Sequence, residues 1–225
     1  MHEPTSDRTV VYGRNAVAEA RRGRRRVHRV WSADEVPASE LTRLAGSPDH
    51  QGIVAEVDPY PYADPGSLLD PSDSLVVVLD QVQDPRNLGA VCRAAEVAGA
   101  TGVLIPARRA AGVTAVACKA SAGAVEHLPV ARARNVADWL RDAKRAGAWV
   151  YGARAGAETR YDAVDWRGRA VLVLGGEEKG LRPRVEAACD ALVAIPQAGR
   201  VGSLNVAGAA SVLLFEALRQ RSPAV

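Results

Sequence analysis

The segment IPQAGRVGSLNV, residues 195–206, decides the fold expected for this chain, because it joins an apolar strand to the apolar segment 207–218. Gly199 and Gly202 allow positive φ angles or a close approach of the backbone to a ligand, and the start of the following helix offers unpaired N–H groups. Such a loop suits a polar cofactor. An ordinary strand-to-helix turn explains the same residues equally well.

A second loop of the same kind lies upstream. The sequence GGEEKG, residues 175–180, follows the apolar strand 170–174. Open α/β sheets bind their ligands at the carboxyl ends of the strands. Two glycine-bearing loops, each at such an end, therefore favour a ligand site over two unrelated turns.

Apolar strands alternate with helices from residue 75 onward, which predicts an α/β fold with a mostly parallel sheet and helices on both faces. We expect strands at 75–79, 102–106, 125–130, 148–153, 170–174 and 191–196, and helices that begin near residues 84, 113, 135, 183 and 207. Asp84 or Asn87 can cap the first of these helices, and Pro85 just after Asp84 fits its first position.

The N-terminal part has a different pattern. Strands at 10–12, 27–31 and 53–57 with short helices at 16–22 and 37–45 predict a small α/β module. Four prolines and a glycine between residues 58 and 74 prevent long regular structure and indicate a linker. We therefore expect three parts: a module at 8–58, a linker at 59–73 and a larger domain at 74–225.

Composition limits the class of protein. The 225 residues are 48% hydrophobic and 24% charged, which is typical of a globular chain. No apolar run approaches the length of a membrane span, and residues 1–7 have no apolar core of a signal peptide, so we expect a cytoplasmic protein. The three cysteines lie in apolar segments and the four histidines are scattered, which favours reduced thiols and no metal site.

Charge is unevenly distributed. Residues 1–31 carry eight arginines against three acidic residues, and the sequence RRGRRR at 21–26 is the centre of this basic region. Clustered arginines suit phosphate groups, which predicts contact with nucleic acid. The alternative is a solvated helix end, and 26 of the 29 basic residues are Arg, which is compatible with a general compositional bias.

Three loop motifs carry the chemistry: Asn87-x-Gly89-x-x-x-Arg93, Gly175-x-Glu177-x-x-Gly180 and Gly199-x-x-x-Ser203-x-Asn205. In this order they resemble the motifs of the SpoU (TrmH-type) ribose 2′-O-methyltransferases of the SPOUT class. The resemblance extends to GRN at 13–15 and HQG at 50–52, which are similar to the family's RNA-binding module, and to KASAGA at 119–124. It covers nearly the whole chain.

The resemblance implies S-adenosylmethionine as methyl donor, a C-terminal trefoil knot, RNA as substrate and a homodimer in which both subunits complete the site. The terminal helix supports a dimer independently, because the segment 212–218 is more apolar than a helix half-open to water needs. A buried core helix is the alternative.

Individual site residues also follow from the resemblance. The catalytic set it implies is Arg93, Asn87, Glu177, Ser203 and Asn205. The cofactor-binding residues it implies are Leu174, Gly175, Gly176, Glu177, Ile195, Gln197, Gly199, Ser203, Leu204 and Asn205. With the basic region added, the candidate RNA-binding residues are Arg14, Arg21, Arg22, Arg24, Arg25, Arg26 and Arg86, and no metal ligand is expected.

The resemblance places Arg93 at the transfer step. A guanidinium holds its proton above about pH 12, so we expect Arg93 to fix the target phosphate and to stabilise developing alkoxide charge. A transient role as base, suggested for the family, stays open. Glu177 is expected to orient Arg93 or to accept a hydrogen bond, and a surface carboxylate near Lys179 is the alternative.

The chain departs from the family pattern at Gln197, where Met is usual, at Gly176, where Ser is common, and at 207–208, where a Ser-Val pair is usual. These positions concern cofactor affinity more than the reaction.

The N-terminal and middle motifs favour the branch that methylates a guanosine in large-subunit rRNA. A tRNA ribose methyltransferase or an antibiotic-resistance rRNA methylase is the alternative, followed by a non-catalytic RNA-binding homologue. A dinucleotide-binding oxidoreductase is disfavoured, since residues 81–89 lack the Gly-x-Gly-x-x-Gly turn.

Overall fold

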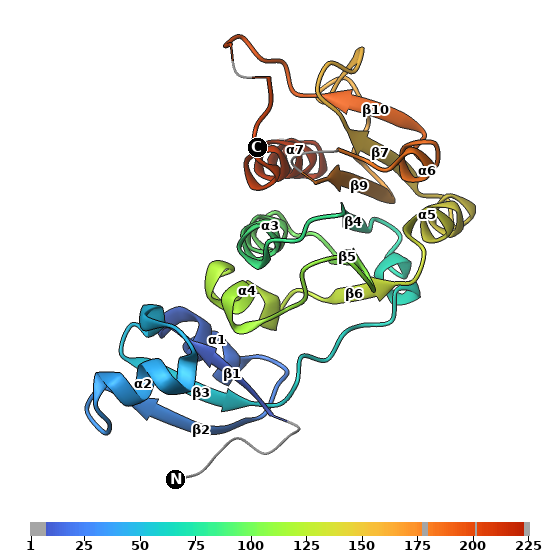
Figure 1. The fold of residues 1–225 in the computed structure, drawn as a ribbon. Coiled ribbons are helices and arrows are strands. Elements are labelled where there is room, and N and C mark those ends of the chain that lie inside the picture. The colour runs from blue at the N-terminus through green and yellow to red at the C-terminus, as the bar shows by residue number, and fades with distance from the viewer. Residues whose placement is uncertain (1–7, 177–179, 201, 223–225) are drawn as a thin grey trace.

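Two sheets organise the chain, a small antiparallel one near the N-terminus and a large parallel one that follows it (Figure 1). The computed structural model describes residues 8–176, 180–200 and 202–222. Seven strands form the large sheet, and three form the small one. The α/β class expected from the alternating pattern is confirmed.

The N-terminal module is built on the three-stranded sheet, in which the strand order is β1-β3-β2 and both pairings are antiparallel. Two helices and a single 3₁₀ turn accompany it. The bounds of these elements are β1 Thr9–Tyr12, α1 Arg14–Arg22, β2 Val27–Ser32, α2 Ala38–Ala45, η1 Pro48–His50 and β3 Ile53–Val57.

The large sheet has the order β6-β5-β4-β9-β7-β10-β8, and all neighbouring strands in it are parallel. Buried aliphatic residues fill its central strands, as a sheet covered on both faces requires. The strands are β4 Leu75–Asp80, β5 Gly102–Pro106, β6 Val130–Ala133, β7 Trp149–Ala153, β8 Thr159–Arg160, β9 Ala170–Gly175 and β10 Ala191–Ala194.

Helices cover both faces of this sheet, as predicted. Alternate residues of β4 divide between two cores: Leu75 and Val77 pack with α3, α4 and α7, whereas Val76 and Val78 pack with α5 and α6 (Figure 1). The bounds are η2 Gly66–Leu69, α3 Pro85–Val97, α4 Ala115–Ala120, η3 Ala124–Glu126, α5 Val136–Arg145, α6 Pro183–Glu186 and α7 Val206–Arg221. None of the helices in the described part of the chain has the length and hydropathy needed to span a bilayer.

The carboxyl ends of the strands form one edge of the sheet, which we call the carboxyl edge. β4 and β9 are paired along their whole length, so that Asp80 lies opposite Gly175. β7 and β10 are paired beside them, with Ala153 opposite Val193. The loops that follow β4, β7, β9 and β10 therefore begin at the same edge.

One expected strand was displaced. The strand predicted at 125–130 is instead the 3₁₀ turn η3 followed by β6 at Val130–Ala133. Pro129 has no N–H group for a ladder, and Gly123 with φ 89° starts a tight turn just before η3. The strand therefore begins only after the proline.

The segment 59–73, expected as a linker, packs against the large domain. Leu68 in η2 is buried in the core beneath α5, and Ala63 forms a bridge to Ala131 of β6. Tyr60 is also buried, and its hydroxyl donates hydrogen bonds to the carbonyl oxygens of Val125 and Leu128 at 3.0 and 3.1 Å. The absence of long regular structure is as expected, but the segment is anchored at several points.

Polar contacts join the module to the large domain. Arg25 is only 6% exposed and forms an ion pair with Glu126 of η3, which is 1% exposed. Arg24 donates to the carbonyl oxygen of Leu128 at 3.2 Å, and Lys119 of α4 donates to the carbonyl oxygen of Asp49. The module therefore packs against α4 and η3 of the large domain.

Candidate active site

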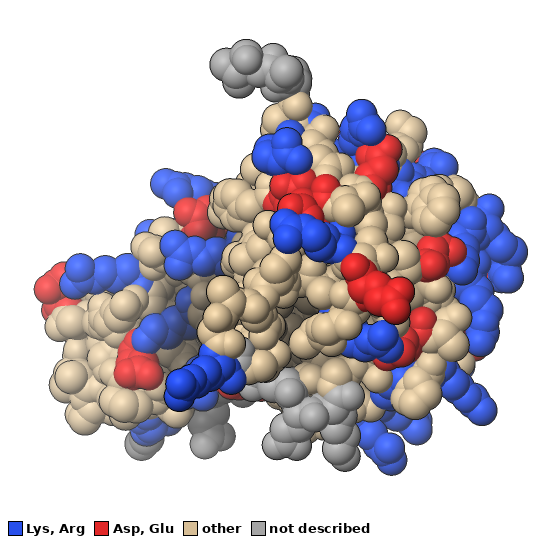
Figure 2. Space-filling model, turned by 90° about the horizontal axis from the view of Figure 1, so that it is seen from above, with Lys and Arg blue, Asp and Glu red and all other residues tan. Residues whose placement is uncertain are grey.

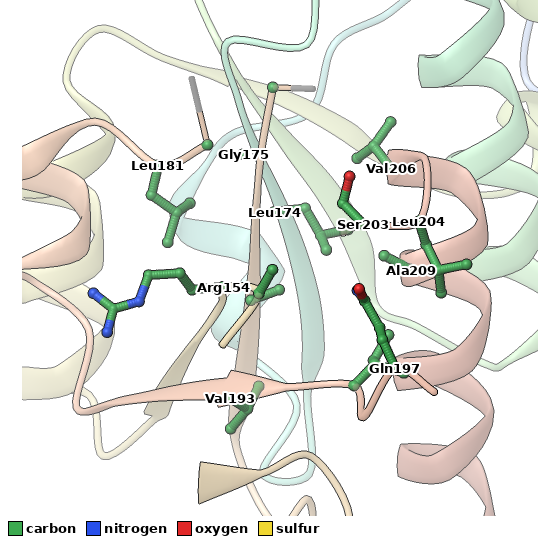
Figure 3. Close-up of a pocket in the computed structure, with 15 residues that line it drawn as sticks. Arg154, Leu174, Gly175, Leu181, Val193, Gln197, Ser203, Leu204, Val206 and Ala209 are labelled. Carbon is green, nitrogen blue, oxygen red and sulfur yellow. The ribbon is translucent and has the colours of Figure 1, made fainter. Parts of the chain in front are cut away.

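A cavity of about 290 Å³ opens at the carboxyl edge, between the loops that follow β7, β9 and β10 and the start of α7 (Figure 3). This location is the one that open α/β sheets use for ligands. The lining residues are Ala153, Arg154, Ala155, Leu174, Gly175, Gly176, Gly180, Leu181, Val193, Ile195, Gln197, Ser203, Leu204, Val206 and Ala209.

Glycine is required where the loop after β9 closes on itself. A Cβ atom on Gly175 would lie 2.2 Å from the carbonyl carbon of Gly180, and Gly180 donates its N–H to the oxygen of Gly176 at 2.9 Å. A Cβ on Gly176 would lie 2.9 Å from the oxygen of Gln81. Hence the loops after β4 and β9 touch, and their backbones rather than side chains form this part of the wall.

The cavity has apolar walls and a polar side. Leu174, Leu181 and Val193 contribute aliphatic side chains, while Gln197 and Ser203 lie on the side of α7 (Figure 3). Arg154 lies opposite these two residues, and its Nη1 donates to Oε1 of Glu186 at 2.8 Å. The arrangement fits a flat apolar ligand with a polar rim.

Asn205 has a structural task at the start of α7. Its Oδ1 accepts a hydrogen bond from the N–H of Gly208 at 2.7 Å, so Asn205 is the N-cap of the helix. A Cβ on Gly208 would approach the same oxygen to 2.9 Å, which makes glycine suitable at a position where the family usually has a larger residue. The cap fixes the direction in which Ser203 and Leu204 enter the cavity.

Helix α3 begins directly after β4 and carries the first motif. Asp84 caps it, accepting from the N–H of Arg86 at 2.8 Å, and Pro85 occupies its first position, as expected. A Cβ on Gly89 would lie 2.5 Å from the oxygen of Ala117, so α3 and α4 are in close contact there. This contact sets the position of the residues on the next turn.

Arg93 lies one turn beyond Gly89 and is exposed. It forms no hydrogen bond or ion pair with any residue that the structure describes, whereas Asn87 is half-buried and has a bonding partner. Arg86 is also exposed and lies seven residues earlier, on nearly the same side of the helix and about 10 Å away along its axis. A guanidinium without a partner among the described residues is thus exposed on the third turn of α3.

Seven of the residues expected to bind the cofactor line this one cavity: Leu174, Gly175, Gly176, Ile195, Gln197, Ser203 and Leu204. Gly199 and Asn205 are not among the lining residues, and neither are Asn87 and Arg93. Glu177 lies outside the described residues. The structure therefore brings the second and third motifs together, whereas the arginine of the first motif is not part of the cavity wall.

Sequence analysis missed the contribution of β7. Ala153, Arg154 and Ala155 line the cavity, although no motif marks them. The signal was present in the fold prediction itself, since a parallel strand expected at 148–153 must end at the same edge as its neighbours.

Among the candidate RNA-binding residues, Arg25 was wrongly assigned. It is buried, with its guanidinium paired to Glu126 and within 3.4 Å of the sulfur of Cys118, so it is not available to a phosphate group. Arg14, Arg21, Arg22, Arg24, Arg26 and Arg86 are exposed. Arg22 is paired with Glu19, and Arg24 contacts backbone oxygens of the large domain.

The cysteines are present as thiols in the described part of the chain. All three cysteines are free, and Cys92 and Cys118 are buried. Burial raises the pKa of Cys118 to about 11 and that of Cys92 to about 12, which keeps both protonated at neutral pH. No group of three or more His, Cys, Asp or Glu residues suited to a metal ion occurs among the residues described.

Two family descriptions match the sequence. Residues 74–215 match the SpoU rRNA Methylase family, and residues 32–63 match the description RNA 2′-O ribose methyltransferase substrate binding. The first match covers the large sheet and the helices from α3 to the middle of α7. The second covers α2, β3 and the start of the segment that leads to η2.

Similar sequences occur in distant bacteria. A putative TrmH family tRNA/rRNA methyltransferase of Bacillus subtilis is 36% identical, and the match covers 95% of this chain and 96% of the relative. A tRNA/rRNA methyltransferase of Mycolicibacterium vanbaalenii is 42% identical over 99% of this chain and 80% of its own length. The chain spans only 62% of a further relative, a tRNA/rRNA methyltransferase of Synechocystis that is 38% identical.

Solved structures show the same arrangement. The SpoU methyltransferase AviRb of Streptomyces viridochromogenes, solved with AdoMet, superimposes with a TM-score of 0.79 at 28% identity and covers 96% of this chain and 91% of its own. The AdoMet-bound rRNA methyltransferase of Sinorhizobium meliloti gives 0.83 at 27% identity, with 95% and 88% covered.

Proposed function

Because the chain belongs to the SpoU rRNA methylase family, we propose that it transfers the methyl group of S-adenosylmethionine to a ribose 2′-hydroxyl of RNA. Family membership confirms the expected enzyme class, an RNA methyltransferase, and the methyl donor is the ligand of two solved neighbours. The observation that carries the proposal is the cavity, around which the loops after β9 and β10 present the residues of two family motifs.

The cavity fits S-adenosylmethionine. Leu174, Leu181 and Val193 give the apolar surface that an adenine ring needs, and the backbone near Gly175 and Gly176 is free of side chains that would exclude it. The donor supplies an electrophilic methyl group on its sulfonium. The protein has to hold this group in line with the attacking oxygen and to exclude water, and Ser203 and Gln197 provide polar contacts at the rim.

Arg93 is proposed to act on the RNA. Its exposed guanidinium would bind a phosphate next to the target ribose and stabilise the negative charge that develops on the 2′-oxygen. Asn87 on the first turn of α3 is proposed to help position the ribose, and Glu177 is kept in the site as a residue that orients the arginine. Asn205 would act indirectly, by capping α7 and so holding the loop that carries Ser203 and Leu204.

A homodimer is part of the proposal, since Arg93 does not line the cavity of its own subunit. Phe215 of α7 is 48% exposed and Val97 of α3 is 58% exposed, and these two helices pack against each other. Leu213 and Leu214 are buried, so half of α7 serves the core and the other half is open to a partner. The trefoil knot expected near the C-terminus stays a prediction.

The N-terminal module at 8–58 is proposed to bind RNA, with 59–73 as its connection and 74–225 as the catalytic domain. Its exposed arginines at 14, 21 and 26 would contact phosphate groups without reading bases, whereas Arg22 is paired with Glu19 and Arg24 contacts backbone oxygens of the large domain. The match of residues 32–63 to a substrate-binding description supports this role. A cytoplasmic location agrees with an RNA substrate.

We favour rRNA, and within it a guanosine of the large subunit, over tRNA. Two solved neighbours named as tRNA enzymes cover only 65% and 67% of this chain, whereas the rRNA methyltransferase of S. meliloti covers 95%. The N-terminal module thus has a counterpart in the rRNA enzyme. A tRNA ribose methyltransferase is the alternative, because the sequence relatives are named tRNA/rRNA methyltransferases.

Methylation of separated RNA tests the proposal. Purified protein with isotopically labelled S-adenosylmethionine is incubated with rRNA or tRNA from a strain that lacks the gene, and the labelled nucleosides are identified by mass spectrometry. We expect 2′-O-methylguanosine from large-subunit rRNA. Label in tRNA alone selects the alternative, and a base-methylated product or no label in either RNA rejects ribose methylation.

A mixing experiment tests the shared site. Arg93→Ala and Asn205→Ala chains are co-expressed with different tags, and mixed dimers are purified. If each site takes Arg93 from one subunit and the Asn205 loop after β10 from the other, each mixed dimer has one intact site. Methyl-transfer activity should then be restored in part. Mixed dimers as inactive as either parent contradict the shared site.

A further inference from the structure

A second pocket of about 590 Å³ lies at the carboxyl edge, between the starts of α5 and α6. Its lining residues are Arg134, Asn135, Ala137, Arg182, Pro183, Arg184 and Val185. Gly180 and Leu181 line the first cavity and the next residues line this pocket, so a single short segment separates the two. Three guanidinium groups in one hollow are a marked concentration of positive charge.

One of the three arginines is held rigidly. Asp80 at the end of β4 is fully buried, and its carboxylate accepts the N–H of Arg182 at 2.9 Å and Nε of the same residue at 2.8 Å. The buried carboxylate thus fixes both the backbone and the side chain of Arg182. The wall of the pocket is preorganised at this point, which reduces the entropy lost when a ligand binds.

The other two arginines are free to bind an anion. Arg134 and Arg184 are exposed and form no ion pair with any residue in the described ranges. The nearest acidic residues in sequence are already paired: Asp138 with Arg141, and Glu186 with Arg154. Asn135 uses its oxygen to cap α5 and its amide group to contact Asp138. The pocket therefore has an excess of positive charge.

The charge continues along the carboxyl edge toward α3. Arg134 follows β6, Arg108 and Arg109 follow the neighbouring strand β5, and Arg86 follows β4, which is next in the sheet. All four are exposed, and residues 101–125 contain no acidic residue. Figure 2 shows basic side chains gathered along the side of the molecule on which α5 and α6 lie in Figure 1.

We propose that the pocket formed by Arg134, Arg182 and Arg184 binds a backbone phosphate of the RNA, and that the arginines after β5 and β4 lead the strand from there to the site. Guanidinium groups grip phosphate oxygens with two hydrogen bonds and carry no information about sequence. The identification of this RNA as the methylated one rests on the proposed function. The pocket is a contact on the catalytic domain, separate from the N-terminal module.

The salt dependence of RNA binding tests the pocket. The full chain is titrated into a fluorescein-labelled single-stranded oligoribonucleotide at several salt concentrations. In the Arg134→Gln/Arg184→Gln variant we expect the slope of log K against log salt to fall by about 0.7 for each lost phosphate contact, equally for RNAs of different sequence. The matched control is Arg141→Gln/Arg145→Gln, which removes the same charge from exposed α5 residues that are paired within their own helix.

A control slope close to that of the unchanged protein, together with a reduced slope in the pocket variant, supports the site. Equal slopes in the two variants, or an unchanged slope in the pocket variant, overturn it. Inorganic phosphate is titrated as a separate probe: if it is bound through these arginines while RNA binding is unaffected by their loss, the pocket takes the free anion and the proposal is wrong.

Two further measurements separate this proposal from the proposed function. Calorimetry with S-adenosylmethionine should give the same heat in both variants, since neither pair of residues lines the first cavity. If the unchanged protein transfers methyl groups but the pocket variant binds RNA like the control, the phosphate site alone fails. If the unchanged protein methylates no RNA yet the slope falls as expected, the proposed function alone fails.

Discussion

Arg25 at the module interface and Arg93 on α3 are the same residue type in two opposite environments. Arg25 is buried between the module and η3, and its Nε donates to Oε2 of Glu126 at 3.0 Å. Arg93 on α3 is exposed and has no partner among the described residues. The first is paired with a carboxylate inside the protein, and the second has its charge exposed to solvent.

RNA binding therefore cannot be assigned to every arginine of a basic cluster. Removing a charge from water is costly, so a buried arginine is found with a carboxylate, and the pair then fixes the elements that carry it. An exposed arginine without a partner keeps its charge available for a phosphate. Burial and pairing, more than position in the cluster, therefore separate structural from functional arginines.

The largest effect is expected from Glu126→Ala. This change leaves the guanidinium of Arg25 buried without its carboxylate, which costs about 3–5 kcal/mol of the free energy of unfolding. Urea denaturation at neutral pH measures it. If the stability changed by less than 1 kcal/mol, the interface would not depend on the pair.

The control for this prediction is Glu40→Ala, which removes the partner of Arg43 on the exposed surface of α2. Surface ion pairs contribute about 0–1 kcal/mol. The double change Arg25→Met/Glu126→Leu removes both charges and should recover most of the lost stability, since no buried charge is left unpaired.

Arg93→Ala is expected to have the next largest effect, on activity. Loss of a group that stabilises developing negative charge lowers the rate by a factor of about 10²–10³, which corresponds to about 2.7–4 kcal/mol. Binding of S-adenosylmethionine and stability should stay nearly unchanged, because the side chain is exposed and does not line the cavity. Full transfer activity on the true RNA substrate would remove the role given to Arg93.

Asn205→Ala should reduce stability less than Glu126→Ala does, and it should affect both the binding of S-adenosylmethionine and the rate of transfer. Loss of the N-cap of α7 costs about 1 kcal/mol, and the loop that carries Ser203 and Leu204 loses its fixed direction. We expect weaker binding of S-adenosylmethionine in calorimetry and a lower rate of transfer. Asn205→Asp keeps an oxygen for the cap, so the stability of this variant should match that of the unchanged protein. If the Asn205→Ala variant bound S-adenosylmethionine normally, the cap would not be needed to hold the loop in place.

The smallest effect concerns pH. Burial raises the pKa of Cys118, which lies beside Arg25, to about 11, compared with 9.0 in an unperturbed thiol. As the pH rises above 9, the thiol of the unfolded chain loses its proton while the folded one keeps it, so the free energy of unfolding falls as the pH passes through this window. Below it, this contribution is constant.

Iodoacetamide labelling checks the same point. At about pH 8.5 the native protein should react much more slowly at Cys118 and Cys92 than the urea-unfolded chain, because the thiolate is the reactive form. Rapid labelling of either cysteine in the native state would show that the interface opens readily.

Much of the fold was predictable from local pattern. The central strands are runs of aliphatic residues such as Leu75–Leu79, and the caps at Asp84 and Asn135 mark helix starts where the structure has them. The strand predicted at 125–130 failed because apolar composition alone does not show that Gly123 and Pro129 shift its start. The motifs located the loops of the site. That the end of β7 also lines the cavity depends on the strand order, in which β7 lies beside β9.

By itself, the sequence determined the parallel α/β architecture, the family and the loops that surround the cavity, because period, turn residues and motif spacing are local properties of the chain. Only the tertiary structure decided which arginines are free. Arg25 and Arg26 are neighbours in sequence, yet one is buried against Glu126, 101 residues away, and the other is exposed. Pairing and burial depend on contacts between distant segments, and no local pattern contains them.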